Sequence, residues 1–559
     1  MSPPLRAVLP GAAVGLAALS WYVATLAPSL VWADGGRLQT DAITGASLYW
    51  HFEELAAVHT DGLPFDRLGV AAWDHPLWVM IGHGLVSIAP GDPAWLLNLL
   101  SAVAAALAVV MVHVIVRTVT SHCWAAAAGA VALGVSHVFW FHAVTAEVYA
   151  LHALFMTSLI AVAVRGPVLT RRRLALVGLI SGLGLANHVM FVLTAIPVAV
   201  YLAIRHRRSP PARRPSLGLS TAASTAAIFL LGLAPWWIQF MRMSRVAGLD
   251  ATLTMAAGFP WLGQRWPGPV GPELATNAAE YLAMALYQFT PIGLGIAVFG
   301  AIRLRGRPEA ALLWTLFAVH ATFSAYYQVA DRFAFHLPSY VIVAVFIGTG
   351  VAAGLEALAA APWPRKAAGP LAVATMALPV AIYAAVPSVL REQGFGDSDV
   401  GIPEVGANAR DGIGYFLNPN QRGDDSAVRY GHATLSDLAP RAHVLVEWPD
   451  GLESYIAMRH YQLTRDLRPD VDLDLMLFTG LPARASMMGI VESESGCRPL
   501  YVASRAQVDT IAQVEPDLVL VQEGQVFRIL PRTGRRPVCG DALDRPEASI
   551  DDLLRSVRR

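Results

Sequence analysis

Long apolar segments separated by short polar ones dominate the first two thirds of the chain. A membrane-crossing helix needs about 20 apolar residues. Eleven segments approach or exceed that length: 7–29, 94–117, 122–139, 147–165, 173–186, 189–204, 216–240, 280–302, 309–328, 337–358 and 367–388. The alternative for the first segment is a cleaved signal peptide, because Val31, Trp32 and Ala33 resemble a small-residue cleavage site.

One further apolar segment, residues 75–90, is short and contains two histidines. Basic residues stay on the cytoplasmic side of membrane proteins, so charge tests whether this segment crosses. If it does not cross and the N-terminus is inside, the inner loops hold 16 basic residues and 2 acids. The outer segments then hold 6 basic residues and 13 acids, and a crossing here would destroy that segregation. We therefore predict an interfacial or re-entrant segment.

The last part of the chain alternates short apolar runs with polar stretches. Residues 443–448, 468–478, 499–504, 516–522 and 525–531 are predicted strands, and residues 451–467 form an amphipathic helical pattern. The sequence thus predicts a transmembrane domain at 1–390, with a large first outer loop at 30–93, and a soluble α/β domain at 391–559. An odd number of spans places that domain outside an inner (plasma) membrane. We find no nucleotide-binding loop in it.

Composition supports a multi-pass membrane protein. The 559 residues are 55% hydrophobic and only 15% charged, with a mean hydropathy of +0.48, whereas soluble proteins carry about 25% charged residues. These values exclude a disordered chain and a nucleic-acid-binding protein. Among the three cysteines, Cys497 and Cys539 lie in the predicted outer domain, where a disulfide and two free thiols both remain open.

Polar residues at span ends are candidates for chemistry, because burying them in a membrane is costly. Five segments place such residues at the predicted outer face: Asp34, Asp74 with His75, Glu147, Asn187 with His188, and Asp331 with Arg332. Their convergence on one face suits a catalytic cleft. A structural or transport role could use the same group of polar residues.

Each candidate has a chemical role and a structural alternative. Asp34 suits a general base or an ordinary solvated acid, and Asp74 suits a helix cap before Pro76. Arg332 suits bidentate phosphate binding or a local pair with Asp331. Glu147 suits a desolvated acid or one stabilised by a helix dipole. Asp34, Asp41, Asp74 and Glu147 could also supply oxygen ligands to a divalent cation, so a metal requirement stays open.

Four sequence blocks carry a resemblance to a known family. They are WADGGRL, DHPLW, SHVFWFHAVTAEVYALHALF and GLGLANHVMFVLTAIP, and DRFAFHLP adds a later outer element. Together they resemble GT-C-type membrane proteins, a group that includes an animal protein O-mannosyltransferase and bacterial membrane proteins. The chain departs from the family pattern at Arg37, where the family tends to have an acid, and at Leu77 and Trp78 within its His-Pro-Pro-Gly block.

The resemblance implies a GT-C-like fold and an outward-facing glycosyltransferase. It would move a sugar from a polyprenyl-phosphate donor to a protein hydroxyl or cell-envelope glycan, with Asp34 as general base. The implied donor-phosphate and substrate-binding residues are Arg332, His75, Asp74, Glu147, Tyr149, Asn187, His188 and Arg37. No cofactor is required by this resemblance, although a divalent cation is compatible with it.

Two other functions compete with the transferase. A transporter or lipid flippase would also use many spans, but its site is expected near the bilayer midplane between inverted repeats. An inactive GT-C scaffold that binds a lipid-linked glycan is favoured by the departure at Arg37.

Overall fold

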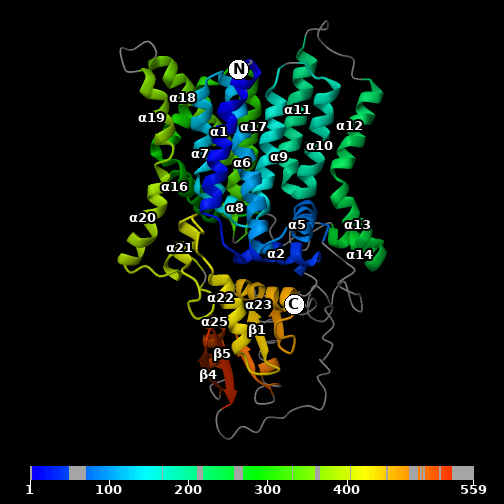
Figure 1. Cartoon of the computed structure of the whole chain (residues 1–559), viewed down its shortest axis with the longest axis vertical. Coiled ribbons are helices and arrows are strands. Elements are labelled where there is room, and N and C mark those ends of the chain that lie inside the picture. The colour runs from blue at the N-terminus through cyan, green and yellow to red at the C-terminus, as the bar shows by residue number, and fades with distance from the viewer. Residues whose placement is uncertain are drawn as a thin grey trace.

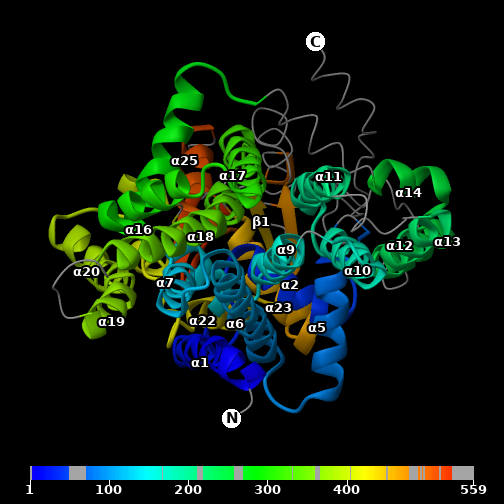
Figure 2. The same cartoon turned by 90° about the horizontal axis from the view of Figure 1, so that it is seen from above.

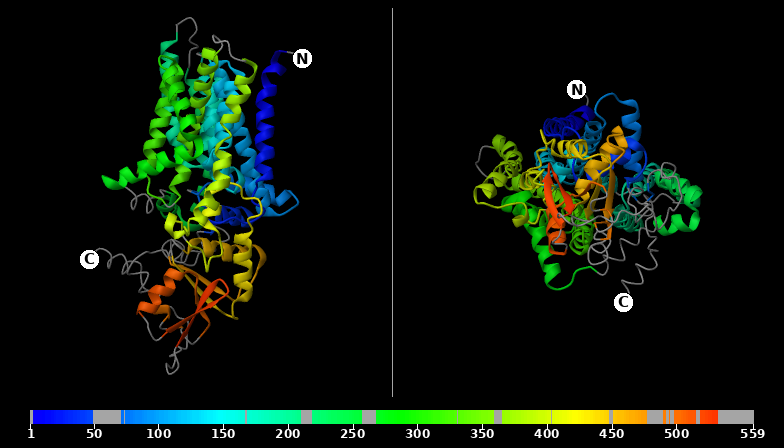
Figure 3. Two further views of the ribbon diagram at one scale, coloured as in Figure 1. Left: turned by 90° about the vertical axis from the view of Figure 1, so that its left-hand side faces the viewer. Right: turned by 90° about the horizontal axis from the view of Figure 1, so that it is seen from below.

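The computed structural model describes most of the chain. The described residues are 3–48, 71–72, 74–166, 168–209, 218–256, 268–329, 331–358, 365–402, 404–447, 451–476, 489–491, 494, 498–514 and 518–531. They form a tall helical bundle with a smaller domain containing a β-sheet at one end (Figures 1 and 3). Cys497 and Cys539 lie outside the described residues, and Cys123 is a free thiol.

The bundle is built from apolar helices that run mainly along its long axis (Figure 1). They are α1 (Pro3–Ala24), α6 (Pro93–Thr120), α7 (Cys123–Gly134), α8 (His137–Val144), α9 (Val148–Val164), α10 (Arg171–Asn187), α11 (Val192–Arg208), α12 (Leu219–Gly232), α13 (Ala234–Ala247), α16 (Pro272–Arg303), α17 (Pro308–Tyr326), α18 (Arg332–Leu358), α19 (Arg365–Thr375) and α20 (Pro379–Glu392). A short helix, α14 (Leu249–Ala256), follows α13. In the described part of the chain, five helices are long and apolar enough to cross a membrane, or up to seven counting bent pairs. The count of eleven spans stays a prediction.

Three of the predicted spans are interrupted by a bend or a non-helical residue. The segment 122–139 breaks between α7 and α8 with a bend of 67°, and 216–240 breaks between α12 and α13 with a bend of 61°. Proline at the start of α13 explains the second break, because its ring prevents a continuous helix. Within 280–302, Thr290 leaves the helical conformation (φ 59°, ψ 163°) immediately before Pro291, which disfavours helical backbone at the residue preceding it.

The N-terminus lies at the end of the bundle farther from the sheet (Figure 1). There Arg307 donates a hydrogen bond to the Val119 carbonyl at 2.7 Å. Arg205 forms an ion pair with Glu309 at 3.2 Å. The terminal domain lies at the opposite end (Figure 1), and the side of the membrane that each end faces stays a prediction.

Two short helices lie between the bundle and the terminal domain. Helix α2 (Ala33–Thr44) and helix α5 (Pro76–Ile88) extend across the end of the bundle instead of along it (Figures 1 and 2). With 13 residues, α5 is too short to cross a bilayer. The predicted cap is wrong at this helix: His75, not Asp74, occupies the position before Pro76, and no side chain caps the helix. Asp74 is instead used in an ion pair.

The terminal domain contains a five-stranded mixed sheet in the order β2-β1-β3-β5-β4. Its strands are β1 (His443–Glu447), β2 (Asp472–Met476), β3 (Leu500–Val502), β4 (Leu518–Glu523) and β5 (Val526–Pro531). Strand β1 pairs parallel with β2 and β3, whereas β5 pairs antiparallel with β3 and β4. Its helices are α21 (Gly412–Leu417), α22 (Ser426–Asp437), α23 (Leu452–Arg465) and α25 (Arg505–Val514).

Helices α22 and α23 fasten the terminal domain onto α2. The Trp32 indole, just before α2, donates a hydrogen bond to Ser426 at 2.7 Å, and its ring packs on Tyr430. Farther along α2, the Thr40 hydroxyl and the His460 ring are joined by a hydrogen bond of 2.8 Å. The terminal domain therefore braces α2, which begins the predicted first outer loop.

A buried histidine in the sheet is paired with two carboxylates. His443 makes hydrogen bonds with Glu494 at 2.7 Å and Asp474 at 2.9 Å. Burial alone would lower the pKa of His443, but its two carboxylate partners outweigh burial and raise the pKa above 6.5. The charged form is therefore favoured in the folded state.

Replacing this histidine should destabilise the domain mainly in acid. Because the folded pKa is raised, the stabilisation is complete below the unfolded pKa and disappears as the pH rises through the folded pKa. We expect His443→Gln to lose about 1–3 kcal/mol of unfolding free energy below the unfolded pKa and much less in alkaline buffer. Thermal unfolding across pH measures this difference, and an equal loss at every pH would contradict the assignment.

Candidate functional site

The site is built first on one face of α2. Asp34, Arg37 and Asp41 are spaced by three and four residues, so a helix places all three on the same side. Two glycines let α2 approach the neighbouring chain closely. A Cβ atom on Gly36 would lie 2.3 Å from the Val31 carbonyl oxygen, and one on Gly35 would lie 3.1 Å from the Ala146 carbonyl oxygen.

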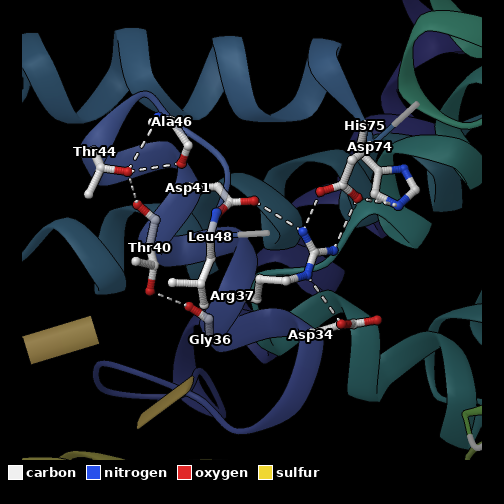
Figure 4. Close-up of polar contacts among 10 residues, drawn as sticks. All are labelled: Asp34, Gly36, Arg37, Thr40, Asp41, Thr44, Ala46, Leu48, Asp74 and His75. Carbon is white, nitrogen blue, oxygen red and sulfur yellow. Dashed lines mark hydrogen bonds and ion pairs between the residues drawn. The ribbon is translucent and has the colours of Figure 1, made fainter. Parts of the chain in front are cut away.

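Arg37 lies at the centre of three carboxylates (Figure 4). Its Nε is 3.3 Å from Asp34 Oδ1, and its Nη1 is 3.0 Å from Asp41 Oδ2. Asp74, which precedes α5, pairs with both terminal nitrogens, including a 3.2 Å contact from Nη2 to Oδ1. The Arg37 and Asp41 side chains are buried, whereas that of Asp34 is 50% exposed.

Asp41 also ties down the end of α2. Its Oδ1 accepts a hydrogen bond from the Leu48 backbone at 2.6 Å. Burial raises the pKa of Asp41 to about 8, despite the opposing effect of Arg37. The protonated form of Asp41 therefore reduces the excess of negative charge around Arg37 near neutral pH.

His75 connects this cluster to the end of α10. It adopts a left-handed backbone (φ 55°, ψ 43°). Its Nδ1 donates to the Asn187 carbonyl at 2.9 Å, and its ring centroid is 4.8 Å from that of His188. Burial lowers the pKa of His75 below 6.5, which favours a neutral ring. A neutral ring does not supply the positive charge that phosphate binding by a protonated histidine requires.

Asn187 and His188 connect the site to α9. Asn187 donates its side-chain amide to the Val148 carbonyl at 3.2 Å. His188 accepts a hydrogen bond from the Met190 backbone at 3.1 Å, and its ring lies 5.9 Å from that of Tyr149. The Tyr149 hydroxyl donates to Asp331 at 3.4 Å. Ion pairs, ring contacts and hydrogen bonds therefore form a continuous path from Asp34 to Asp331.

Glu147 adjoins this path. Its backbone N–H and carbonyl both bond to the Ser101 hydroxyl at 3.1 Å, which fixes the start of α9. Its carboxylate lies beside Gly35, where a Cβ atom would be 3.7 Å from Glu147 Oε1. Glu147 therefore lies within electrostatic range of Asp34, Asp331 and Arg37.

Arg332 begins α18 and turns toward α16. Its Nη2 pairs with the Glu280 carboxylate, and its Nη1 donates to the Gln328 side chain at 3.2 Å. The described ion pair of Arg332 is thus with Glu280 and not with its neighbour Asp331. The buried Nε of Arg332 has no hydrogen-bond partner among the residues that the structure describes.

The side chains near Arg37 can be compared with the ligands that a metal ion requires. Within the described ranges, no group of three or more histidine, cysteine or acidic side chains is arranged to hold a metal ion. The oxygens of Asp34, Asp41 and Asp74 converge, but the Arg37 guanidinium stands between them. These residues do not fit a metal centre, and no step of the proposed reaction uses one.

Sequence reasoning did not include two residues in the site. Asp41 appeared only as a potential metal ligand, although its spacing from Arg37 on a helix would have placed it on the same face. Glu280 was the first residue of a predicted span, and its position as an acid at the outer end of that span was an available signal.

The described fold, in which five to seven helices or bent helix pairs are long and apolar enough to cross a membrane, is similar to the fold of GT-C membrane glycosyltransferases. Residues 74–211 match the family model described as the Protein O-mannosyl-transferase TMEM260 N-terminal domain. This match covers the segment from Asp74 through α11 and confirms the resemblance carried by the central sequence blocks. No curated protein matches the chain.

Solved structures support the same fold. ArnT from Cupriavidus metallidurans bound to undecaprenyl phosphate is 13% identical, with a TM-score of 0.53 over 97% of this chain and 100% of that chain. The apo form of that ArnT is 15% identical, with a TM-score of 0.53 over 94% of this chain and 98% of that chain. The Archaeoglobus fulgidus oligosaccharyltransferase, tethered to an acceptor peptide, is 12% identical over 94% of this chain and 74% of that chain, and its TM-score of 0.45 is too low to support an argument.

Proposed function

We propose that this chain is a membrane glycosyltransferase that moves a sugar from a polyprenyl-phosphate donor to an extracytoplasmic acceptor. The observation that carries the proposal is the half-exposed Asp34 carboxylate held on α2 by the buried Arg37. Such a carboxylate is accessible to an acceptor and fixed in orientation, which a general base requires. The fold match to an ArnT bound to undecaprenyl phosphate supports a lipid-linked donor. The family description supports a protein hydroxyl as acceptor, with a cell-envelope glycan as the alternative.

In the proposed step, Asp34 removes the proton from the acceptor hydroxyl as its oxygen attacks the anomeric carbon. A bond forms between that carbon and the acceptor oxygen, and the bond to the donor phosphate oxygen breaks. The phosphate oxygen keeps the electron pair and leaves as polyprenyl phosphate. Arg332 stabilises the negative charge that develops on the phosphate, after exchanging Glu280 for the donor. His75, Glu147, Tyr149, Asn187 and His188 shape the donor and acceptor pockets in this proposal.

The proposed orientation places this chemistry outside the inner membrane. The N-terminus is cytoplasmic and the terminal α/β domain is extracytoplasmic, beside the end of the bundle that carries Asp34. The lipid tail of the donor lies in the bilayer, and the acceptor approaches from the side of the terminal domain.

The direct test uses the purified full chain in liposomes. Polyprenyl-phosphate-linked mannose is the donor probe, and a peptide rich in serine and threonine is the acceptor probe. The proposal expects labelled peptide and free polyprenyl phosphate in equal amounts. Donor binding without transfer to peptide or envelope glycan favours the inactive scaffold, and movement of the intact donor across the bilayer favours the flippase.

A variant at Glu280 tests the role of Arg332. Glu280→Gln removes the charge that competes with the donor phosphate for this guanidinium. Because the ion pair is partly exposed, we expect a three- to tenfold lower KM for the donor, or about 1 kcal/mol, with kcat little changed. Steady-state kinetics at varied donor concentration measures this effect.

Glu309→Gln is the matched control for this variant. Glu309 also pairs with an arginine, Arg205, but it lies at the opposite end of the bundle. Its KM for the donor should equal that of the unaltered protein. A raised KM in Glu280→Gln would show that Arg332 depends on Glu280 for its position and does not exchange it for phosphate.

A further inference from the structure

The Arg37 cluster has the form of a cation site whose cation is a side chain. Carboxylates from α2 and from the segment before α5 converge on one guanidinium (Figure 4). Oxygen ligands that converge in this way are those that hard divalent cations bind. Here all three acids contact Arg37, so the Arg37 guanidinium occupies the position that a divalent cation would take.

Burial favours a cation at the centre of the cluster. Only 3% of the Arg37 side chain is exposed, and Asp41 and Asp74 are 0% and 5% exposed. Carboxylates removed from water at short mutual distance repel each other strongly unless a positive charge lies between them. Without Arg37, Asp74 and the acids of α2 would share one buried space with no positive charge between them.

The same geometry separates Arg37 from the donor. Its Nε and both terminal nitrogens are directed at the three acids, and its burial leaves little surface for a phosphate. This geometry therefore favours a positioning role for Arg37 over the substrate-binding role predicted from the sequence. Asp34 is the exposed member of the cluster, so Arg37 connects the buried acids to the proposed base.

We propose that Arg37 is a built-in cation that replaces a divalent metal ion in the first outer loop and positions Asp34. Only the positioning of Asp34 rests on the proposed function, because the replacement of an ion is a matter of binding and stability. The unaltered protein then needs no added metal, and a neutral residue at position 37 leaves a group of three acids able to take one.

The test measures ion binding and thermal unfolding of the full chain in detergent. For the unaltered protein, we expect no change in unfolding temperature with Mn²⁺ or with a chelator. For Arg37→Ala, we expect an unfolding temperature lower by several degrees that millimolar Mn²⁺ largely restores, since an ion that binds only the folded state stabilises it. Mn²⁺ binding is followed directly by paramagnetic resonance.

Two variants control for non-specific binding. Arg37→Ala combined with Asp41→Asn removes one ligand and should lose most of the Mn²⁺ effect. Arg332→Ala removes an arginine whose ion pair in the described part of the chain is with Glu280, and it should show no Mn²⁺ effect. Arg37→Gln is a second substitution at the same position that preserves more of the side-chain volume. It is expected to bind Mn²⁺ as Arg37→Ala does.

Three results would overturn the proposal. One is destabilisation of the unaltered protein by the chelator, and another is a folded Arg37 variant that does not bind Mn²⁺. The third is failure of both Arg37 variants to fold even when Mn²⁺ is present during purification. All three results come from unfolding and ion-binding measurements and need no transfer assay. An absence of glycosyltransferase activity would therefore contradict the proposed function but not the proposal that Arg37 replaces an ion.

Discussion

Asp34→Asn is expected to reduce sugar transfer by about 100-fold or more, the usual contribution of a general base. An asparagine has the same size, and its carbonyl oxygen can still accept the hydrogen bond from Arg37 Nε that Asp34 accepts at 3.3 Å. The geometry of α2 should therefore persist while the ability to take a proton is lost. The rate of peptide labelling in liposomes measures the effect, and an unchanged unfolding temperature shows that the fold is intact.

Asp92→Asn is the matched control for this substitution. Asp92 precedes α6 near the same end of the bundle and caps that helix by accepting a hydrogen bond from the Trp95 backbone at 2.8 Å. Asparagine caps helices as well as aspartate does, so this variant changes the same charge without disturbing structure. Equal activity of Asp34→Asn and Asp92→Asn would remove Asp34 as the base and leave Glu147, beside Gly35, as the next carboxylate to test.

The sequence predicted that polar residues from distant segments would face one end of the membrane domain. The structure brings most of them together, because contacts run from Asp34 through Arg37, Asp74, His75 and His188 to Tyr149 and Asp331. The prediction rests on the topology inferred from the sequence. In a chain with few charges, the number of preceding spans determines the face on which each polar residue lies.

Partner choice was much less predictable. Arg332 pairs with Glu280, which is 52 residues away in sequence, and Arg37 pairs with Asp74 across 37 residues. Both pairs depend on how helices cross and on the placement of α2 and α5 across the end of the bundle, which apolar periodicity does not encode. The bends after Gly134 and Gly232 were missed for a similar reason, because hydropathy measures length and not direction.

The terminal domain was easier to anticipate than its docking. Apolar runs predicted each of the five strands to within a few residues, because short β-rich segments between polar stretches are a local signal. Contacts such as that between Trp32 and Ser426 join residues 394 positions apart. No local pattern in the sequence marks either residue as a partner of the other.

Arg410→Ala should destabilise the terminal domain and loosen its contact with the membrane domain at Trp32. The Arg410 side chain is 1% exposed and pairs with Glu453 at the start of α23. Its guanidinium also lies over the rings of Trp32, Tyr415 and Phe416, at 5.4, 5.2 and 4.9 Å. Removing it leaves Glu453 without this partner at a mostly buried interface, which costs about 3–5 kcal/mol. Thermal unfolding and the rate of tryptic cleavage within the terminal domain measure the loss.

Two further variants separate the buried charge from a general effect of losing an arginine. Arg429→Ala breaks the pair with Asp425 on an exposed face of α22 and should change the unfolding free energy by less than about 1 kcal/mol. Combining Arg410→Met with Glu453→Leu removes both charges, so it should recover much of the stability that Arg410→Ala loses. Full stability of Arg410→Ala would contradict the docking role. Because α23 packs against α2, where Ile456 lies beside Gly36, the loosened domain should also lower transfer through misplacement of Asp34.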